Sequence, residues 1–161
     1  MSEPAPAAEK ARDPFVRLVE TMQRLRGPDG CPWDREQDHA SISLNLIEEA
    51  YETVDAIDRQ DDADLKEELG DLLLQVVFHA EIARGEGRFD IGGVIEELVD
   101  KLIARHPHVF AGRSAADGPP DAAAVLANWE AIKRQQKGRQ SLHEGIPPGL
   151  PALVYAHKVL R

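Results

Sequence analysis

The chain has 161 residues, 42% of them hydrophobic and 30% charged, a composition that fits one compact domain with a buried core. Its net charge of −10 argues against a nucleic acid partner, because phosphate backbones bind basic surfaces. No apolar run reaches membrane-spanning length, and the single cysteine, Cys31, excludes an intramolecular disulfide and a cysteine-based zinc site. Residues 1–12 lack the pattern of a signal peptide, so we expect a disordered tail on a cytoplasmic protein that binds no membrane.

The spacing of apolar residues predicts an all-α fold, with helices and no strands. Loops are expected at residues 27–38 and 112–120, and a linker at 145–151, where glycine, proline or charged residues interrupt the helical pattern. The predicted helices run from Asp13-Pro14 to a stop at Gly27-Pro28, from about Ser41 or Ser43 to Arg59, from about Ala63 to Arg84, from Asp90 to a stop at Pro107, from about Asp121 to Lys137, and from Ala152 to Leu160.

The third and fourth predicted helices carry the strongest apolar patterns. The centre of the third, residues 72–78, is apolar almost all round, which predicts a helix that is buried on several sides. Asp90 is the expected N-cap of the fourth. The core face predicted for the fourth helix consists of Ile91, Val94, Ile95, Leu98, Leu102 and Ile103.

Two acidic motifs carry most of the functional information, Glu49-x-x-Glu52 and Glu68-x-x-Asp71. A spacing of three residues places both carboxylates of a motif on one face of a helix, and two such helices side by side would gather four carboxylates. The four would repel one another unless a cation neutralised them. A hard divalent cation with oxygen ligands fits best, most plausibly Mg²⁺, and such an ion commonly binds a substrate's phosphates as well.

The charge distribution supports this interpretation. Residues 48–71 hold eleven acidic and two basic residues, whereas residues 101–161 carry a net charge of +5. An acidic run is more often an ordinary solvated helix face than a metal site. Here the acids recur at helical spacing beside apolar residues, and Glu68 and Asp71 lie at the edge of an apolar stripe, where an unpaired charge is costly.

The motifs resemble the MazG family of nucleoside triphosphate pyrophosphohydrolases. The resemblance covers about residues 15–137 and rests on the run from Met22 to Asp38, Glu48-Glu-Ala-Tyr-Glu52, Glu67-Glu-Leu-Gly-Asp71 and Arg105-His-Pro-His-Val-Phe110. It implies an all-α helical bundle in which two long antiparallel helices carry the ExxE and ExxD motifs, assembled as a homodimer or a higher oligomer. It also implies Mg²⁺-dependent hydrolysis of a nucleoside triphosphate to the monophosphate and pyrophosphate. Non-canonical nucleotides are candidate substrates, and Mn²⁺ is a candidate substitute for Mg²⁺.

By the same resemblance, the metal ligands are Glu49, Glu52, Glu68 and Asp71. Glu48, beside the first ligand, is the candidate catalytic base, although its position round the helix equally suits a plain surface charge.

Four further residues are candidates for binding the substrate. Lys101 and Arg105 would contact its phosphates. Basic residues are also common near a helix C-terminus simply because they interact favourably with the helix dipole. Trp33 would stack on a base or pack on the core as a lid, and Asn45 either faces the site or is a surface amide. His106 and His108 are interpreted as capping or packing residues.

The predicted organisation has four parts: the tail at 1–12, a MazG-like catalytic domain at 13–110, a loop and additional helix at 111–144, and a linker with the start of an incomplete helix at 145–161. Many MazG proteins carry two such domains in tandem, and this chain resembles the N-terminal copy, so its own activity is a separate question. The alternative is a catalytically weak MazG-like module that serves in oligomerisation or partner binding. A di-iron carboxylate bundle fits less well, because neither acidic motif includes the required histidine.

Overall fold

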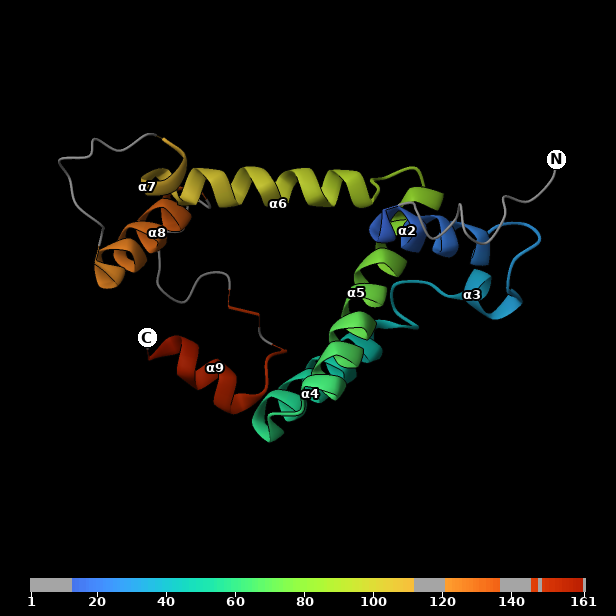
Figure 1. The fold of residues 1–161 in the computed structure, drawn as a ribbon, viewed down its shortest axis with the longest axis horizontal. Helices are drawn as coiled ribbons and strands as arrows, with labels where there is room; N and C mark the ends of the chain where they lie inside the picture. The colour runs from blue at the N-terminus through green and yellow to red at the C-terminus, as the bar shows by residue number, and fades with distance from the viewer. Residues whose placement is uncertain (1–12, 112–120, 137–145, 148, 161) are drawn as a thin grey trace. The chain divides into compact units, whose positions relative to one another are not determined.

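The fold is seen in a computed structural model, which describes residues 13–111, 121–136, 146–147 and 149–160. Within these ranges every regular element is a helix, which confirms the predicted all-α fold (Figure 1). The predicted tail at 1–12 and the predicted loop at 112–120 lie outside the described residues. The helices are α2 (Pro14–Leu25), α3 (Pro32–Glu36), α4 (Ser43–Arg59), α5 (Asp62–Gly85), α6 (Ile91–Arg105), α7 (Pro107–Phe110), α8 (Ala122–Gln136) and α9 (Ala152–Val159).

The chain divides into two compact units, residues 1–97 and 98–161, with the boundary inside α6. The first unit contains α2 to α5 and the start of α6, and it carries both acidic motifs. The second contains the rest of α6 with α7, α8 and α9. No described helix is both long and apolar enough to cross a membrane.

The core of the first unit lies between α2 and the C-terminal half of α5. Asp13 begins α2, because its carboxylate accepts hydrogen bonds from the backbone amides of Phe15 and Val16 at 2.8 and 3.3 Å. The apolar face of α2 then packs on α5. The buried core residues are Met22, Ile42, Val77, Phe78 and Ile82, with Phe15, Leu18, Val19, Leu25, Leu74 and Ile91 packed around them.

A tight turn pairs α4 with α5. Gln60 has the left-handed backbone conformation, with φ 56°, and the next amide, that of Asp61, donates to the Ala56 carbonyl oxygen at 3.1 Å. The Asp61 carboxylate then accepts a hydrogen bond from the Ala63 amide, which caps α5. The two helices therefore reverse direction within a few residues and run antiparallel along one another (Figure 1).

The segment predicted as a loop at 27–38 contains the short helix α3, so that prediction was wrong in part. Pro32 at the first position of α3 favours the helical turn. The segment is fixed to the rest of the unit by Arg26, whose guanidinium donates to the backbone carbonyls of Asp34 and Gln37. A side chain at Gly30 would collide with backbone carbonyl oxygens at the end of α2, which explains the glycine there.

Two predictions of burial were wrong. The buried residues of α5 all lie in its second half, whereas Leu69 and Leu73 in the first half are exposed, as is Val76, which lies in the second half but points away from the core. The reason is that α4 covers one face of the first half and α2 packs beside the other end of the helix. Most of the expected core face of α6 is also exposed within the described structure. Its exposed members are Ile95, Leu98, Leu102 and Ile103.

Candidate functional site

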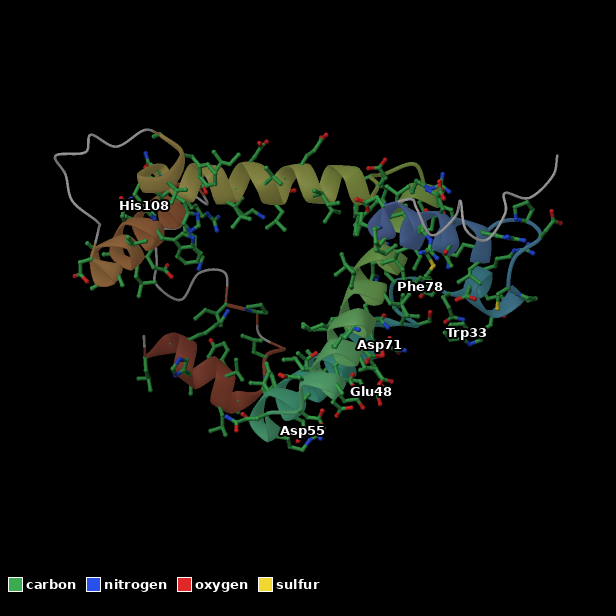
Figure 2. The ribbon with its side chains drawn as sticks, in the orientation of Figure 1. Trp33, Glu48, Asp55, Asp71, Phe78 and His108 are labelled. Carbon is green, nitrogen blue, oxygen red and sulfur yellow. The ribbon has the colours of Figure 1, made fainter. Side chains whose placement is uncertain are left out.

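Three carboxylates from two helices meet in the first unit. Oxygen atoms of Glu49 on α4 and of Glu68 and Asp71 on α5 lie within 4.8 Å of one another, and all three side chains are half-buried. Figure 2 labels Asp71 on α5 and Glu48, the neighbour of Glu49, on α4. The structure therefore brings together three of the four predicted metal ligands, with a separation of oxygens that one cation can span.

The spacing of the motifs about the turn explains this meeting. Glu49 precedes Gln60 by eleven residues and Asp71 follows it by eleven, while Glu52 and Glu68 are each eight residues from it. In an antiparallel pair of helices, residues at equal distances from the turn lie at the same level. Each acid of the first motif is thus level with one acid of the second.

The carboxylates destabilise one another's charged forms. Partial burial, followed by repulsion from Asp71, Glu52 and Glu68, raises the pKa of Glu49 above its ordinary value. Burial, followed by repulsion from Glu52 and other neighbouring acids, raises the pKa of Glu68. Such a site binds a proton or a metal cation more readily than isolated carboxylates would.

Glu52 is outside the set of three but acts on two of its members. Its side chain is exposed, and its charge contributes to the raised pKa values of both Glu49 and Glu68. Its carboxylate therefore lies near those of Glu49 and Glu68. Its role as a fourth ligand stays a prediction.

The other candidates of the first unit have different environments. Glu48 is exposed on α4 beside Glu49, and Asn45, one turn earlier, is half-buried. Trp33 lies on α3 with 58% of its surface exposed, so the alternative that it packs on the core as a lid is wrong for this structure (Figure 2). An exposed tryptophan is free to contact a ligand, and its predicted role in base stacking stays a prediction.

Lys101 and Arg105 belong to the second unit. Arg105 is buried there: its Nε donates to Gln136 Oε1 at 3.1 Å, and its guanidinium lies 5.4 Å from the ring centre of Trp129. Lys133, one turn after Trp129, approaches the same ring at 4.5 Å. The sequence interpretation missed this aromatic–cation cluster, although the spacing of Trp129 and Lys133 on a helix was a signal for it.

The predicted structural role of His106 is confirmed. Its Nδ1 donates a hydrogen bond to the Leu102 carbonyl oxygen at 2.6 Å, which satisfies a backbone acceptor in the last turn of α6. His108 lies on α7 with its ring 5.6 Å from that of His106 (Figure 2). Both histidines are in the second unit, whereas the three carboxylates are in the first.

Comparison with known proteins places these motifs in a family. Residues 37–110 match the model of the MazG nucleotide pyrophosphohydrolase domain. Over 147 residues, the chain is 52% identical to a nucleoside triphosphate pyrophosphohydrolase of Escherichia coli K12. This match covers 89% of this chain and 54% of that protein. It is 49% identical over 147 residues to the nucleoside triphosphate pyrophosphohydrolase/pyrophosphatase MazG of Thermotoga maritima, covering 90% of this chain and 54% of that one.

The chain thus spans about half the length of the curated relatives it matches. Among solved structures, a crystal structure of a mazG-related protein from Thermotoga maritima superposes with a TM-score of 0.60 at 27% identity, covering 74% of this chain and 98% of that one. This neighbour supports the all-α arrangement seen here. The family model, the relatives and the fold agree with the motifs, and the chain belongs to the MazG family.

Proposed function

We propose that this chain hydrolyses nucleoside triphosphates to a nucleoside monophosphate and pyrophosphate, in a reaction that requires Mg²⁺. The observation that carries the proposal is the meeting of Glu49, Glu68 and Asp71 within 4.8 Å on two antiparallel helices. The names of the relatives from Escherichia coli and Thermotoga maritima point to the same activity. Non-canonical nucleotides are the substrates that we would test first.

The chemistry of the donor set fits Mg²⁺. Carboxylate oxygens are the ligands that hard divalent cations prefer, and the raised pKa values of Glu49 and Glu68 indicate an excess of negative charge at the site. With Glu52 as the fourth ligand, the site would also accept Mn²⁺. A bound cation would neutralise the carboxylates and the substrate's phosphates, and it would stabilise the departing pyrophosphate.

The remaining candidates would bind and orient the reactants. Glu48 would accept a hydrogen bond from the attacking water, hold it in line with the α-phosphorus and take its proton. Lys101 would bind the phosphate oxygens, and Arg105 would do so on leaving its contacts with Gln136 and Trp129. Trp33 would stack on the base. Asn45, which lies on α4 one turn before Glu49, would donate a hydrogen bond to the substrate.

We also propose that the chain assembles as a homodimer or a higher oligomer. Large apolar side chains remain exposed on both helices of the acidic pair; Leu44, for example, is 73% exposed and Leu69 is 52% exposed. Apolar surface of this extent on adjacent helices is typical of a protein interface. The exposed members are Leu44, Ile47, Tyr51, Val54 and Ile57 on α4 and Leu69, Leu73 and Val76 on α5, and we call them the α4–α5 apolar surface.

The α4–α5 apolar surface also favours the second candidate function, a catalytically weak MazG-like module for oligomerisation or partner binding. Release of pyrophosphate distinguishes the two. We expect the purified chain to release pyrophosphate and monophosphate from at least one nucleotide of a panel of standard and modified triphosphates, only when Mg²⁺ or Mn²⁺ is present. Chromatography should detect no diphosphate, because attack at the α-phosphorus leaves none.

Accumulation of diphosphate with orthophosphate would contradict attack at the α-phosphorus. Absence of turnover over the whole panel, in a chain that remains folded and oligomeric, would favour the non-catalytic module. An unchanged rate after chelation of divalent cations with EDTA would contradict the metal site.

A further inference from the structure

Two histidines outside the carboxylate site are in direct contact. His39 lies in the segment 37–42 that joins α3 to α4, and His79 is on the buried half of α5. Their Nδ1 atoms are 2.7 Å apart, and the rings are stacked with an angle of 3° between their planes. On its other side, His39 Nε2 is bonded to the guanidinium of Arg88, which follows α5. His39 therefore connects the segment before α4 both to α5 and to the residues that follow α5.

The hydrogen bonds of this group determine where its protons are. An arginine guanidinium only donates, so His39 Nε2 must be the acceptor and carries no proton. Neutral His39 then has its proton on Nδ1 and donates it to Nδ1 of His79. That leaves the proton of neutral His79 on Nε2, a buried atom with no hydrogen-bond partner among the described residues.

Either added proton breaks a bond in this arrangement. Protonation of His39 would place an N–H of Nε2 against the N–H groups of Arg88, and protonation of His79 would place two Nδ1–H groups face to face. We propose that His39 and His79 form a proton-sensitive latch, which holds the segment 37–42 on α5 while both rings are neutral and releases it when either ring is protonated.

The electrostatics of the surroundings agree with the direction of this switch. Burial, and then the charge of His39, lowers the pKa of His79 below its ordinary value. Folded protein therefore binds fewer protons here than unfolded protein, and this contribution to stability is complete above about pH 6.5 and is lost as the pH falls below it. Charged groups on the segments that form and adjoin the pair include Asp38, Arg88 with its partner Glu86, and the paired Glu81 and Arg84. Arg26 also lies over the ring of Phe78 and donates to the Gln37 carbonyl oxygen.

Asp38 cannot be the source of a switch in this pH range. Its carboxylate accepts hydrogen bonds from the amides of Ser41 and Ala40 at 2.8 and 2.9 Å, and these bonds lower its pKa below the ordinary value of an aspartate. It thus stays ionised throughout the range in which histidines titrate. The turn formed by these bonds leads into α4, which begins six residues before Glu49.

The proton positions can be tested directly in the wild-type chain. Long-range ¹H–¹⁵N spectra at pH 8 should show His39 protonated on Nδ1 and His79 protonated on Nε2, with the signals assigned by means of His39→Ala and His79→Asn. On acidification, His79 should titrate below about pH 6.5, the ordinary value of a histidine. The opposite tautomers, or titration of His79 at or above that value, would overturn the proposal.

Hydrogen exchange tests the release of the segment. After correction for intrinsic rates, we expect the amides of residues 38–46 to lose roughly 10-fold in protection between pH 8 and pH 5.5. His39→Ala should show the low protection at both values, whereas the control His157→Ala should behave like the wild type. The His39→Ala variant keeps the carboxylate site, so any pH dependence that arises from titration of those carboxylates remains in that variant. Equal pH dependence in His39→Ala and the wild type would overturn the latch.

Discussion

The two halves of α5 differ in what their side chains do. In the C-terminal half, Val77, Phe78 and Ile82 are buried against α2 and form the core of the first unit. In the N-terminal half, apolar side chains such as Leu69 are exposed, and Glu68 and Asp71 face the acids of α4. One continuous helix therefore supplies stability at one end and mutually repelling charges at the other. The packed end allows the other to carry a site that is unfavourable for folding.

Phe78→Ala should have the largest effect on folding. It removes a ring that is 4% exposed and that also lies 5.2 Å from the Arg26 guanidinium, so we expect a loss of about 3–5 kcal/mol in the free energy of unfolding. Urea denaturation measures this loss. As a matched control, Val16→Ala on the exposed side of α2 should cost less than about 1 kcal/mol. Similar losses in both variants would contradict the location of the core.

Asp71→Asn should have the largest effect on activity without a loss of stability. Replacing this proposed metal ligand should lower the rate of pyrophosphate release by more than about 100-fold. The melting temperature without metal should stay level or rise, because the change removes repulsion from Glu49 and Glu68. Asp58→Asn removes the same charge from the exposed surface of α4 and serves as the control. Equal rates in the two variants would contradict the site.

Disruption of the α4–α5 apolar surface should change assembly and leave the α2–α5 core intact. We expect light scattering of the wild type to give at least twice the chain mass of 17.8 kDa. Tyr51→Glu places a charge on that surface and should weaken the oligomer by at least about 10-fold in dissociation constant, because a charge cannot be buried unpaired. Val16→Glu, on α2, should not. A monomeric wild type would contradict the proposal.

The effect of Mg²⁺ on stability should depend on pH. Glu49 and Glu68 have raised pKa values in the folded chain, so the folded state holds more protons than the unfolded state in the carboxylate range. Stability without metal should therefore fall as the pH rises through that range. Mg²⁺ competes with these protons, so its stabilisation should be larger at pH 7.5 than at pH 5, reaching about 1.4 kcal/mol at ten times its dissociation constant.

Thermal unfolding with and without 5 mM Mg²⁺ would measure this difference. The stabilisation should disappear in Asp71→Asn and persist in Asp58→Asn. A shift in melting temperature that is the same at both pH values, or that survives in Asp71→Asn, would show that the ion binds elsewhere.

Gln60→Gly should have the smallest effect, at the turn that sets the level of the two acidic motifs. Gln60 has φ 56°, a conformation that glycine adopts more easily, so the change should stabilise the chain by up to about 1 kcal/mol. Thermal denaturation checks the sign. Pyrophosphate release should be unchanged, since the number of residues between the motifs is the same. Destabilisation would indicate that the Gln60 side chain itself is needed.

The sequence predicted the local structure well, because local structure depends on short spacings. Helical periodicity predicted the all-α fold, and three-residue spacing predicted that Glu68 and Asp71 share a helix face, as their meeting with Glu49 illustrates. The Asp90 cap was predicted from the residue type alone, and its carboxylate accepts a hydrogen bond from the Gly93 amide at 2.9 Å.

What only the tertiary structure decided is which apolar faces have a partner. The pattern of Leu69 and Leu73 resembles that of a buried helix, yet α2 reaches only the other half of α5, so these two residues are exposed. Likewise, no local pattern places His39 against His79, because forty residues separate them and the contact depends on how the segment before α4 folds back over α5. Spacing along a helix is set by the backbone, whereas burial and long-range contacts are set by the packing of distant segments.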